Sequence, residues 1–497
     1  MTQPPVVEEP AQTHQPVLPP EPVATYLSPR TTVVYQRPAW GSPFRGRIDP
    51  EQAYSVYTLI PNGPDCEGDG WAKVVDGGYV CLERSEKVST QVVQWPQLPE
   101  GQNTPFVYAR PRQSRDGVLE ADIPVYGSRW AYARQKEPIS YLEGRRQYAF
   151  TESKAKFLTT ANGKVVPKKN MRVYQPSAFQ GRVLAENPVE PELRAGWSIR
   201  RRTWVYDRPS LRGGKKTGAL RYHDQVDTRA QPVLSKGDVF AVIPEAGRDG
   251  GDGYVLADDI RSFIPGPKRE GAQSDELWID VDLDQQVLSV LRGEATEFVT
   301  LISSGAGRHP TPVGLYRISN KLAFAKMASR RDANANETYY VEAVPWIQYF
   351  HWRYALHASY WHNSFGRRRS HGCINLSPAD ARYVFDRTSP DLPPGLTSIY
   401  ELRRDPGTVV RVRRGNVVIE DRRRSFAGEV SPVGSSPACA PEADCPAPAG
   451  STDSPSEGTP ATACVSPSGC PTTDESATRP ESEGSSEPPR VESDSRQ

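Results

Sequence analysis

The stretch His357-Ala-Ser-Tyr-Trp-His-Asn-Ser-Phe-Gly-Arg-Arg-Arg-Ser-His-Gly-Cys-Ile-Asn375 contains three of the seven histidines in this 497-residue chain. It also contains the only cysteine between residues 82 and 438, Cys373. A thiol close to an imidazole is typical of a cysteine nucleophile, because the thiolate is the reactive form and a nearby imidazole raises its fraction at neutral pH. Cys373 is therefore the predicted nucleophile. The candidate bases are His357, His362 and His371.

The residues beside Cys373 predict how the loop that carries the thiol is held. Gly372 allows a tight backbone shape, so we expect its N–H and that of Cys373 to converge on an oxyanion. Ser370 and Asn375 are predicted to support this loop. For Asn375, a contact with substrate is the alternative.

A short helix is predicted directly after the thiol. Ser377 is suited to the N-cap, Pro378 to the first helical position and Asp380 to a capping box. Ala381, Val384 and Phe385 then form one apolar face. Upstream, residues 354–356 are predicted to form a strand that delivers His357 to the same place.

These residues resemble the YkuD-type L,D-transpeptidase family, whose signature is a histidine, a variable flap and then Ser/Thr-His-Gly-Cys-X-Asn. The resemblance extends upstream to Leu277, where Leu277-Trp-Ile-Asp-Val-Asp and Val287-Leu-Ser-Val-Leu alternate like two strands. It includes Ile302-Ser-Ser-Gly-Ala-Gly and Thr311-Pro-Val-Gly, and covers residues 275–403.

The resemblance implies a mainly β catalytic domain with a few short helices and no metal or organic cofactor. It implies that Cys373 is the acyl acceptor, that His357 is the base, and that the carbonyl of Ala358 orients His357. Many members of the family have Gly or Ser where Ala358 stands, but only the carbonyl is needed. His371, two residues from the thiol, is assigned a hydrogen-bonding role, and His362 is predicted to be an exposed flap residue.

The predicted substrate-binding residues are Tyr339, Trp361 and Arg369. The arginines 367–369 are suited to the carboxylates of a peptide stem, although a solvated flap edge explains them equally well. Core packing is the alternative for the aromatic residues. A zinc site made from the three histidines and Cys373 is a weaker alternative, because the spacing has neither a CxxC nor an HExxH frame.

The resemblance implies that the substrate is the tetrapeptide stem of peptidoglycan, and that a carbapenem can acylate Cys373. The expected product is a 3→3 cross-link formed through a thioester, in cell-wall biogenesis. Two alternatives keep the same site but change the acceptor: water would give an L,D-carboxypeptidase, and a protein amine would give a protein-to-wall tether. A wall-binding protein without catalysis is the third alternative.

Composition limits the class of protein. The net charge of +1 gives no reason to expect nucleic acid as a partner. A hydrophobic content of 37%, with 48 Pro and 39 Gly, is typical of short-stranded β domains with disordered ends. No apolar run has the length of a membrane span.

The sequence gives less direct information about the cellular compartment of the protein. The first ten residues contain no apolar signal core, whereas the family acts outside the cytoplasm. We expect a periplasmic or cell-envelope protein whose signal segment was removed or whose start is misassigned; a cytoplasmic protein is the alternative. Cys66 and Cys81 lie in one small segment and are suited to a disulfide. Cys439/Cys445 and Cys464/Cys470 form two close pairs, which leaves Cys373 as the odd thiol.

The chain divides into six predicted segments. Short alternating runs with Gly and Pro turns predict small β barrels of the bacterial Src-homology type, with the clearer case first. An intermediate segment contains Asn162-Gly163, a hairpin signal, and is predicted to be a spacer or, alternatively, a contact for substrate. The segments are a linker (1–23), a first barrel segment (24–86), the intermediate segment (104–199), a possible second barrel segment (200–264), the catalytic segment (275–403) and a disordered Ser/Pro/Thr/Glu-rich tail (425–497).

Overall fold

The computed structural model describes residues 21–415, apart from 62, 64, 95, 115–118, 145 and 329–338. Within these residues the protein is mainly β, as predicted, with many strands and two α-helices, α1 (Arg129–Ala133) and α2 (Pro378–Phe385). The tail, the four cysteines in it and most of the linker lie outside the described residues. In the part of the chain that the structure describes, no helix is long and apolar enough to cross a membrane.

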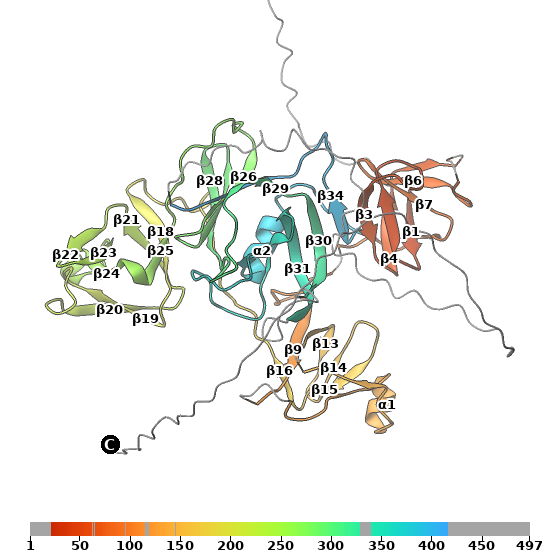
Figure 1. The fold of residues 1–497 in the computed structure, drawn as a ribbon, viewed down its shortest axis with the longest axis horizontal. Coiled ribbons are helices and arrows are strands. Elements are labelled where there is room, and N and C mark those ends of the chain that lie inside the picture. The colour runs from red at the N-terminus through yellow and green to blue at the C-terminus, as the bar shows by residue number, and fades with distance from the viewer. Residues whose placement is uncertain are drawn as a thin grey trace, which may run out of the picture. The chain divides into compact units, whose positions relative to one another are not determined.

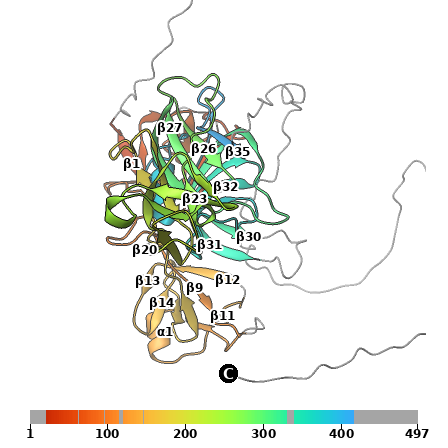
Figure 2. The ribbon, with the colours of Figure 1, turned by 90° about the vertical axis from the view of Figure 1, so that its left-hand side faces the viewer.

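A six-stranded sheet with the order β17-β28-β27-β26-β35-β29 forms one half of the catalytic segment. The predicted pair of strands after Leu277 is confirmed as the antiparallel hairpin β26–β27. β35 follows residue 403, the predicted end of the segment, and pairs in parallel with β26. Figure 2 labels both strands. The bounds are β17 (Arg182–Val183), β26 (Leu277–Asp282), β27 (Val287–Arg292), β28 (Ala295–Leu301), β29 (Gly314–Arg317) and β35 (Val409–Arg413).

Buried charges join β26 to β35. Asp280 accepts hydrogen bonds from Arg411 Nε at 2.6 Å and from Arg413 Nε at 2.8 Å, and Asp282 accepts from Arg413 Nη1 at 2.8 Å. These four side chains are at most 8% exposed. Removing one partner of a buried pair leaves an unpaired charge, at a cost of roughly 3–5 kcal/mol. β35 is therefore an integral strand of this domain.

A second sheet carries the signature residues. β31 pairs antiparallel with β30 and β32, and β33 pairs in parallel with β32. Figure 1 labels β30, β31 and α2 in this part of the chain. Leu356 and Ile374 from this sheet pack with Ile279 and Val290 from the first sheet and with Val384 from α2. The bounds are β30 (Asn320–Ala328), β31 (Tyr340–His351), β32 (Tyr354–Ala358), β33 (Ile374–Leu376) and β34 (Ser398–Tyr400).

Helix α2 begins as the sequence predicts. Ser377 Oγ accepts the N–H of Asp380 at 3.2 Å, and Pro378 is the first helical residue. The carboxylate of Asp380, however, is buried and accepts from Gly181 N–H at 2.9 Å and from the Thr300 hydroxyl at 2.5 Å. Asp380 thus ties α2 to β28 and to the segment before β17, which is a tertiary role that the capping-box prediction missed.

The first barrel segment has its own core, formed by Tyr26, Val34, Tyr54 and Val80 among others. The predicted Cys66–Cys81 disulfide is confirmed, with the two Cα atoms 5.7 Å apart. β3 pairs with β34, so one sheet continues from this segment into the catalytic segment. The bounds are β1 (Ala24–Ser28), β2 (Thr32–Tyr35), β3 (Phe44–Ile48), β4 (Gln52–Val56), β5 (Thr58–Ile60), β6 (Trp71–Val75), β7 (Gly78–Cys81) and β8 (Glu86–Val88).

We expect the Cys66→Ser/Cys81→Ser double variant to lose about 3 kcal/mol of unfolding free energy, because the disulfide closes a loop with a sequence separation of 15. Denaturant unfolding of the two proteins measures the difference. Intact mass of the unreduced wild type after alkylation should show no label at either position. Labelling of both in the native, unreduced protein would contradict the disulfide.

The intermediate segment is β-rich. The predicted hairpin at Asn162-Gly163 is confirmed as β14–β15, and Gly163 adopts a φ of +74°. β12 pairs in parallel with β31, so this segment extends the second catalytic sheet. The bounds are β9 (Val107–Pro111), β10 (Pro124–Val125), β11 (Ser140–Tyr141), β12 (Arg146–Phe150), β13 (Glu152–Ser153), β14 (Phe157–Thr159), β15 (Val165–Pro167) and β16 (Met171–Val173).

The second barrel segment contains a five-stranded antiparallel sheet, β20-β19-β24-β23-β22, and a three-stranded sheet, β21-β18-β25. Val205, Val226 and Val255 lie in its core. The bounds are β18 (Leu193–Ser198), β19 (Arg202–Tyr206), β20 (Lys216–Arg221), β21 (Gln225–Arg229), β22 (Val233–Ser235), β23 (Asp238–Ile243), β24 (Gly253–Leu256) and β25 (Ile260–Ser262), with two 3₁₀ turns at Arg248–Gly250 and Ala257–Asp259.

Candidate active site

Two adjacent parallel strands bring His357 and Cys373 to one face of the sheet. His357 pairs with Asn375 in the β32–β33 register, and Cys373 lies one residue before β33. Side chains alternate along a strand, and Leu356, Ala358, Ile374 and Leu376 enter the core on the other face. The side chains of His357 and Cys373 therefore lie on the face opposite this core.

His357 is held in one tautomer. Its Nδ1 lies 2.9 Å from the carbonyl oxygen of Ala358, as the family resemblance implies. The ring is 3% exposed, and burial lowers its pKa to about 4. The imidazole is therefore neutral at pH 7. Because Nδ1–H donates to Ala358, Nε2 keeps a free lone pair that can accept a proton.

The thiol is neutral as well. Burial raises the pKa of Cys373, against smaller lowering effects of the Ala355 backbone and Arg353. The Sγ atom lies 3.7 Å from the carbonyl oxygen of Arg353. The thiol and the imidazole on this face of the sheet are thus both neutral at pH 7. This differs from the sequence interpretation, in which the imidazole raises the thiolate fraction.

The loop before Cys373 has one tightly fixed conformation. Ser370 Oγ donates to the carbonyl of Cys373 and accepts the N–H of Gly372 at 3.0 Å. Gly372 has a φ of +114°, and a Cβ there would lie 2.4 Å from the Tyr354 ring. Only glycine meets both conditions.

The prediction that the Gly372 N–H faces an oxyanion is wrong, because that N–H is bonded to Ser370. Among the described residues, the N–H groups of His371 and Cys373 have no hydrogen-bond acceptor. These two groups are the better candidates for an oxyanion site.

His362 is buried, at 9% exposed, so its prediction as an exposed flap residue is wrong. Its Nδ1 accepts the N–H of Ser364 at 3.1 Å, and its Nε2 lies 3.0 Å from the Asn375 side-chain nitrogen. Asn375 also exchanges two backbone hydrogen bonds with Ser303. The backbone of Asn375 therefore holds the loop around the site, whereas its side-chain Oδ1 is buried without a hydrogen-bond partner among the described residues, so the contact with substrate stays a prediction beside the structural role.

We expect acid to destabilise the fold through His362. Burial lowers its pKa to about 3, with smaller contributions from Arg369 and His357. An unfolded chain titrates near 6.5, so the stability is present above pH 6.5 and is lost as the pH falls towards 3. Between pH 7 and 4.5 this loss is roughly 2–3 kcal/mol. His362→Gln should lose correspondingly less in denaturant unfolding over the same interval. An equal loss in both proteins would show that His362 is not the group responsible.

Two residues near Cys373, namely Thr311 and His309, were not predicted as site residues from the sequence. Thr311 is 3% exposed; its hydroxyl donates to the Gly372 carbonyl at 2.8 Å and accepts the N–H of Gly305 at 2.9 Å. The ring of His309 lies 4.8 Å from the ring of His371. The signal for Thr311 was present, since Thr311-Pro-Val-Gly is part of the family resemblance, but its partner could not be known.

The predicted substrate-binding residues lie in different surroundings. The Trp361 ring lies 5.9 Å from the His357 ring, and the Tyr339 ring lies 5.4 Å from that of exposed His371. Arg369 is exposed and donates to Ser364 Oγ at 3.2 Å. Its neighbours are engaged elsewhere: Arg367 donates to the Ile199 carbonyl and Arg368 pairs with Asp284 at 3.0 Å. Of the three arginines, Arg369 is the one available near the site.

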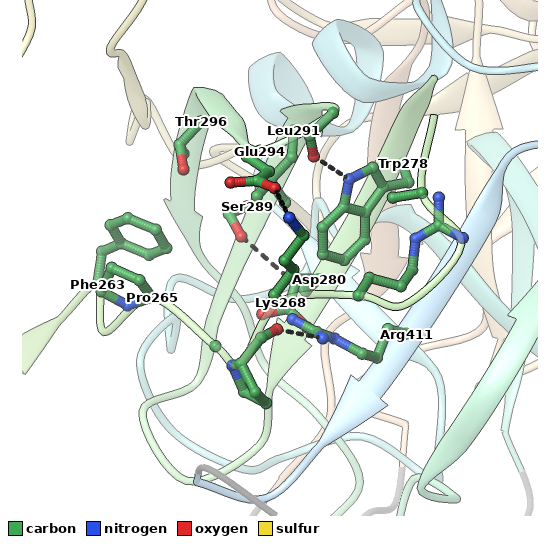
Figure 3. Close-up of a pocket in the computed structure, with 15 residues that line it drawn as sticks. Phe263, Pro265, Lys268, Trp278, Asp280, Ser289, Leu291, Glu294, Thr296 and Arg411 are labelled. Atoms are coloured by element: carbon green, nitrogen blue, oxygen red, sulfur yellow. Dashed lines mark hydrogen bonds and ion pairs between the residues drawn. The ribbon is translucent and has the colours of Figure 1, made fainter. Parts of the chain in front are cut away.

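A separate cavity of about 190 Å³ lies beside the six-stranded sheet (Figure 3). Its lining includes Trp278, Asp280 and Arg411, and the ion pair of Lys268 with Glu294 also borders it. None of the predicted site residues lines this cavity. Among the described residues no group of three or more His, Cys, Asp or Glu side chains is arranged to hold a metal ion.

A thiol next to β33 and an imidazole on the parallel strand β32 are the residue types used in cysteine acyl transfer. Residues 276–412 match the model of the YkuD family, described as the L,D-transpeptidase catalytic domain. This part of the chain is a YkuD-type L,D-transpeptidase catalytic domain. No curated protein matches the chain.

Solved structures that are similar to part of the chain carry the name L,D-transpeptidase. A cysteine-to-serine variant of the Enterococcus faecium enzyme is 24% identical over 28% of this chain and 50% of its own, with a TM-score of 0.22. The enzyme of Xylanimonas cellulosilytica is 22% identical over 30% and 65%, with a TM-score of 0.22. LdtMt1 in complex with imipenem is 20% identical over 38% and 90%, with a TM-score of 0.23. The chain spans about half the length of the first of these structures.

Proposed function

We propose that this protein is an L,D-transpeptidase that forms 3→3 cross-links in peptidoglycan through a thioester on Cys373. The observation that carries the proposal is a free thiol on the same face of the β32–β33 strands as a neutral imidazole whose Nδ1 is fixed by the Ala358 carbonyl. This arrangement leaves Nε2 as a base for the thiol.

In the first step Nε2 of His357 takes the thiol proton as Sγ attacks the carbonyl between the third stem residue and the terminal D-alanine. The oxyanion receives hydrogen bonds from the N–H groups of His371 and Cys373. The C–N bond then breaks, His357 returns the proton to the leaving amine, and D-alanine departs. A thioester remains on Cys373.

In the second step the side-chain amine of a neighbouring stem attacks the thioester. His357 takes a proton from this amine and returns it to the thiolate as the C–S bond breaks. The products are one new amide and the free thiol, so protons and bonds balance without a cofactor. Water or a protein amine in place of the stem amine would give the carboxypeptidase or the tethering reaction.

The test is incubation of the protein with purified sacculi, followed by muropeptide analysis by mass spectrometry. The expected products are 3→3 dimers and free D-alanine. Tripeptide stems without dimers would indicate the carboxypeptidase, and stems joined to protein would indicate the tether. Unchanged muropeptides, together with sedimentation of the protein with the sacculi, would favour the non-catalytic wall-binding protein. We further propose that the protein acts in the periplasm or cell envelope, where this substrate lies; fractionation of cells tests the location.

A further inference from the structure

The intermediate segment reaches the catalytic domain along strand β31. Arg146 and Gln147 of β12 pair in parallel with Tyr340 and Val341 of β31. The N–H of Ala149 donates to the Glu342 carboxylate at 3.1 Å. β31 begins next to Tyr339, whose ring lies beside His371. This contact therefore lies at the edge of the candidate site.

Strand β31 has an irregularity where the segment meets it. The β30–β31 register shifts between Ala325 and Met327, and Ala343 has a φ of +44°, in the left-handed region. For a non-glycine residue this conformation costs about 1–2 kcal/mol. It persists only where the surroundings hold it, and a bulge also removes carbonyls from the regular ladder.

Two tyrosines supply the missing donors, one from each side of the contact. Tyr108 of β9 donates its hydroxyl to the Ala343 carbonyl at 2.8 Å, and Tyr360 donates to the Glu342 carbonyl at 3.3 Å. Their rings stack with centroids 3.4 Å apart and planes inclined by 9°. Both are 1% exposed. Burial raises the pKa of both phenols well above the usual value, so both remain protonated donors.

Ring contacts continue from this stack to His357, first edge to face and then tilted. The ring of Tyr360 lies 4.9 Å from that of Trp361, and the ring of Trp361 lies 5.9 Å from that of His357. Tyr360 lies two residues after Ala358, and the Ala358 carbonyl fixes the tautomer of His357. Cys373 and Trp361 pack against the same apolar cluster that contains Tyr108 and Tyr360. Tyr108 thus supports the short chain segment that holds the base.

We propose that Tyr108 is a positioning residue for acyl transfer, acting through Tyr360 and the β31 bulge on the 358–361 segment. The intermediate segment then contributes Tyr108 to the support of the base, while its separate core around Leu158 takes no part, and its predicted role as a spacer is incomplete. The proposal rests on the proposed function. The contrary hypothesis is that the stack only joins two folded parts and has no effect on His357.

The test compares Tyr108→Phe and Tyr108→Ala with Leu158→Ala. Leu158 is fully buried in the separate core of the intermediate segment, so its truncation destabilises that segment without touching the stack. The probe is imipenem, with acylation of the whole protein followed by intact mass over a range of concentrations. Unfolding midpoints are measured for all variants.

We expect Tyr108→Phe to lower the acylation rate at saturation about 10-fold, because one buried carbonyl loses its donor. Tyr108→Ala should lower the rate by roughly 10²-fold, as for a displacement of catalytic groups by about 1 Å. The concentration for half-saturation should change less than the rate. Leu158→Ala should acylate at the wild-type rate.

The pH profile separates positioning from packing. In Tyr108→Ala, water should reach His357 and raise its pKa from about 4 towards 6.5, which moves the acid limb of the acylation profile upwards. The other charged or titratable groups around the site are Cys373 and His362, together with Arg353 near the thiol and Arg369 near His362. These groups are unchanged in both variants.

An unchanged rate and acid limb in Tyr108→Ala, with an unfolding midpoint lowered as in Leu158→Ala, would overturn the proposal. An NMR titration of the His357 ring in wild type and Tyr108→Ala gives the same comparison without any reaction. If the wild type is not acylated, the proposed function is wrong. The effect of Tyr108 on His357 is then decided by the titration alone: a changed His357 pKa in Tyr108→Ala supports it, and an unchanged pKa contradicts it.

Discussion

The Cys373→Ser variant is expected to lose acylation by imipenem and cross-linking of sacculi by roughly 10³-fold or more, as for other nucleophile removals. The reason is that the basicity of His357 suits the acidity of a thiol and not that of a hydroxyl. Burial lowers the pKa of His357 to about 4, so its Nε2 is a weak base. A hydroxyl is far less acidic than a thiol, and a base of this strength cannot activate it during attack.

Intact mass after exposure to imipenem gives the result directly, since each acylated chain gains the mass of one inhibitor. The serine differs from the cysteine by one atom, so the unfolding midpoint should remain close to that of the wild type. Cys373→Ala is the matched control and should be equally inactive. Retention of more than a few per cent of the activity by Cys373→Ser would place the nucleophile elsewhere.

We expect the His357→Ala and His371→Ala variants to lose acylation for different reasons. His357→Ala removes the proton acceptor, so acylation then depends on thiolate formed by hydroxide. Burial raises the pKa of the Cys373 thiol, so the rate of this variant should still be increasing above pH 8.5, where a free thiol titrates. The wild type should instead lose activity only near pH 4, where His357 becomes protonated.

His371→Ala leaves this base in place. Its side chain is exposed and contacts the rings of His309 and Tyr339, so its loss should loosen the loop that carries the two proposed oxyanion donors. The resulting loss should be nearly independent of pH, and up to about 10²-fold if one donor moves. Acylation rates from pH 4 to 10 for the two variants provide the measurement. Rescue of His371→Ala, and not of His357→Ala, at high pH would exchange the two assignments.

Short-range patterns in the sequence were sufficient for several elements. Ser377-Pro378 predicts the start of α2, because a cap and a preset φ act within one turn. Asn162-Gly163 predicts the β14–β15 hairpin, because the turn requires a left-handed residue at one position. The signature alone singled out His357 and Cys373 and the carbonyl of Ala358.

Burial and long-range pairing were decided only by the tertiary structure. His362 has the sequence surroundings of an exposed flap, yet Ser364, Asn375 and the neighbouring strands enclose it. The Gly372 N–H is bonded to the hydroxyl of Ser370, and the Tyr354 ring leaves no room for a Cβ at this position. Tyr108 meets the Ala343 carbonyl across a sequence separation of 235 residues. Local propensity carries no information about such a contact, because it joins two strands, β9 and β31, that lie far apart in the sequence and meet only in the folded protein.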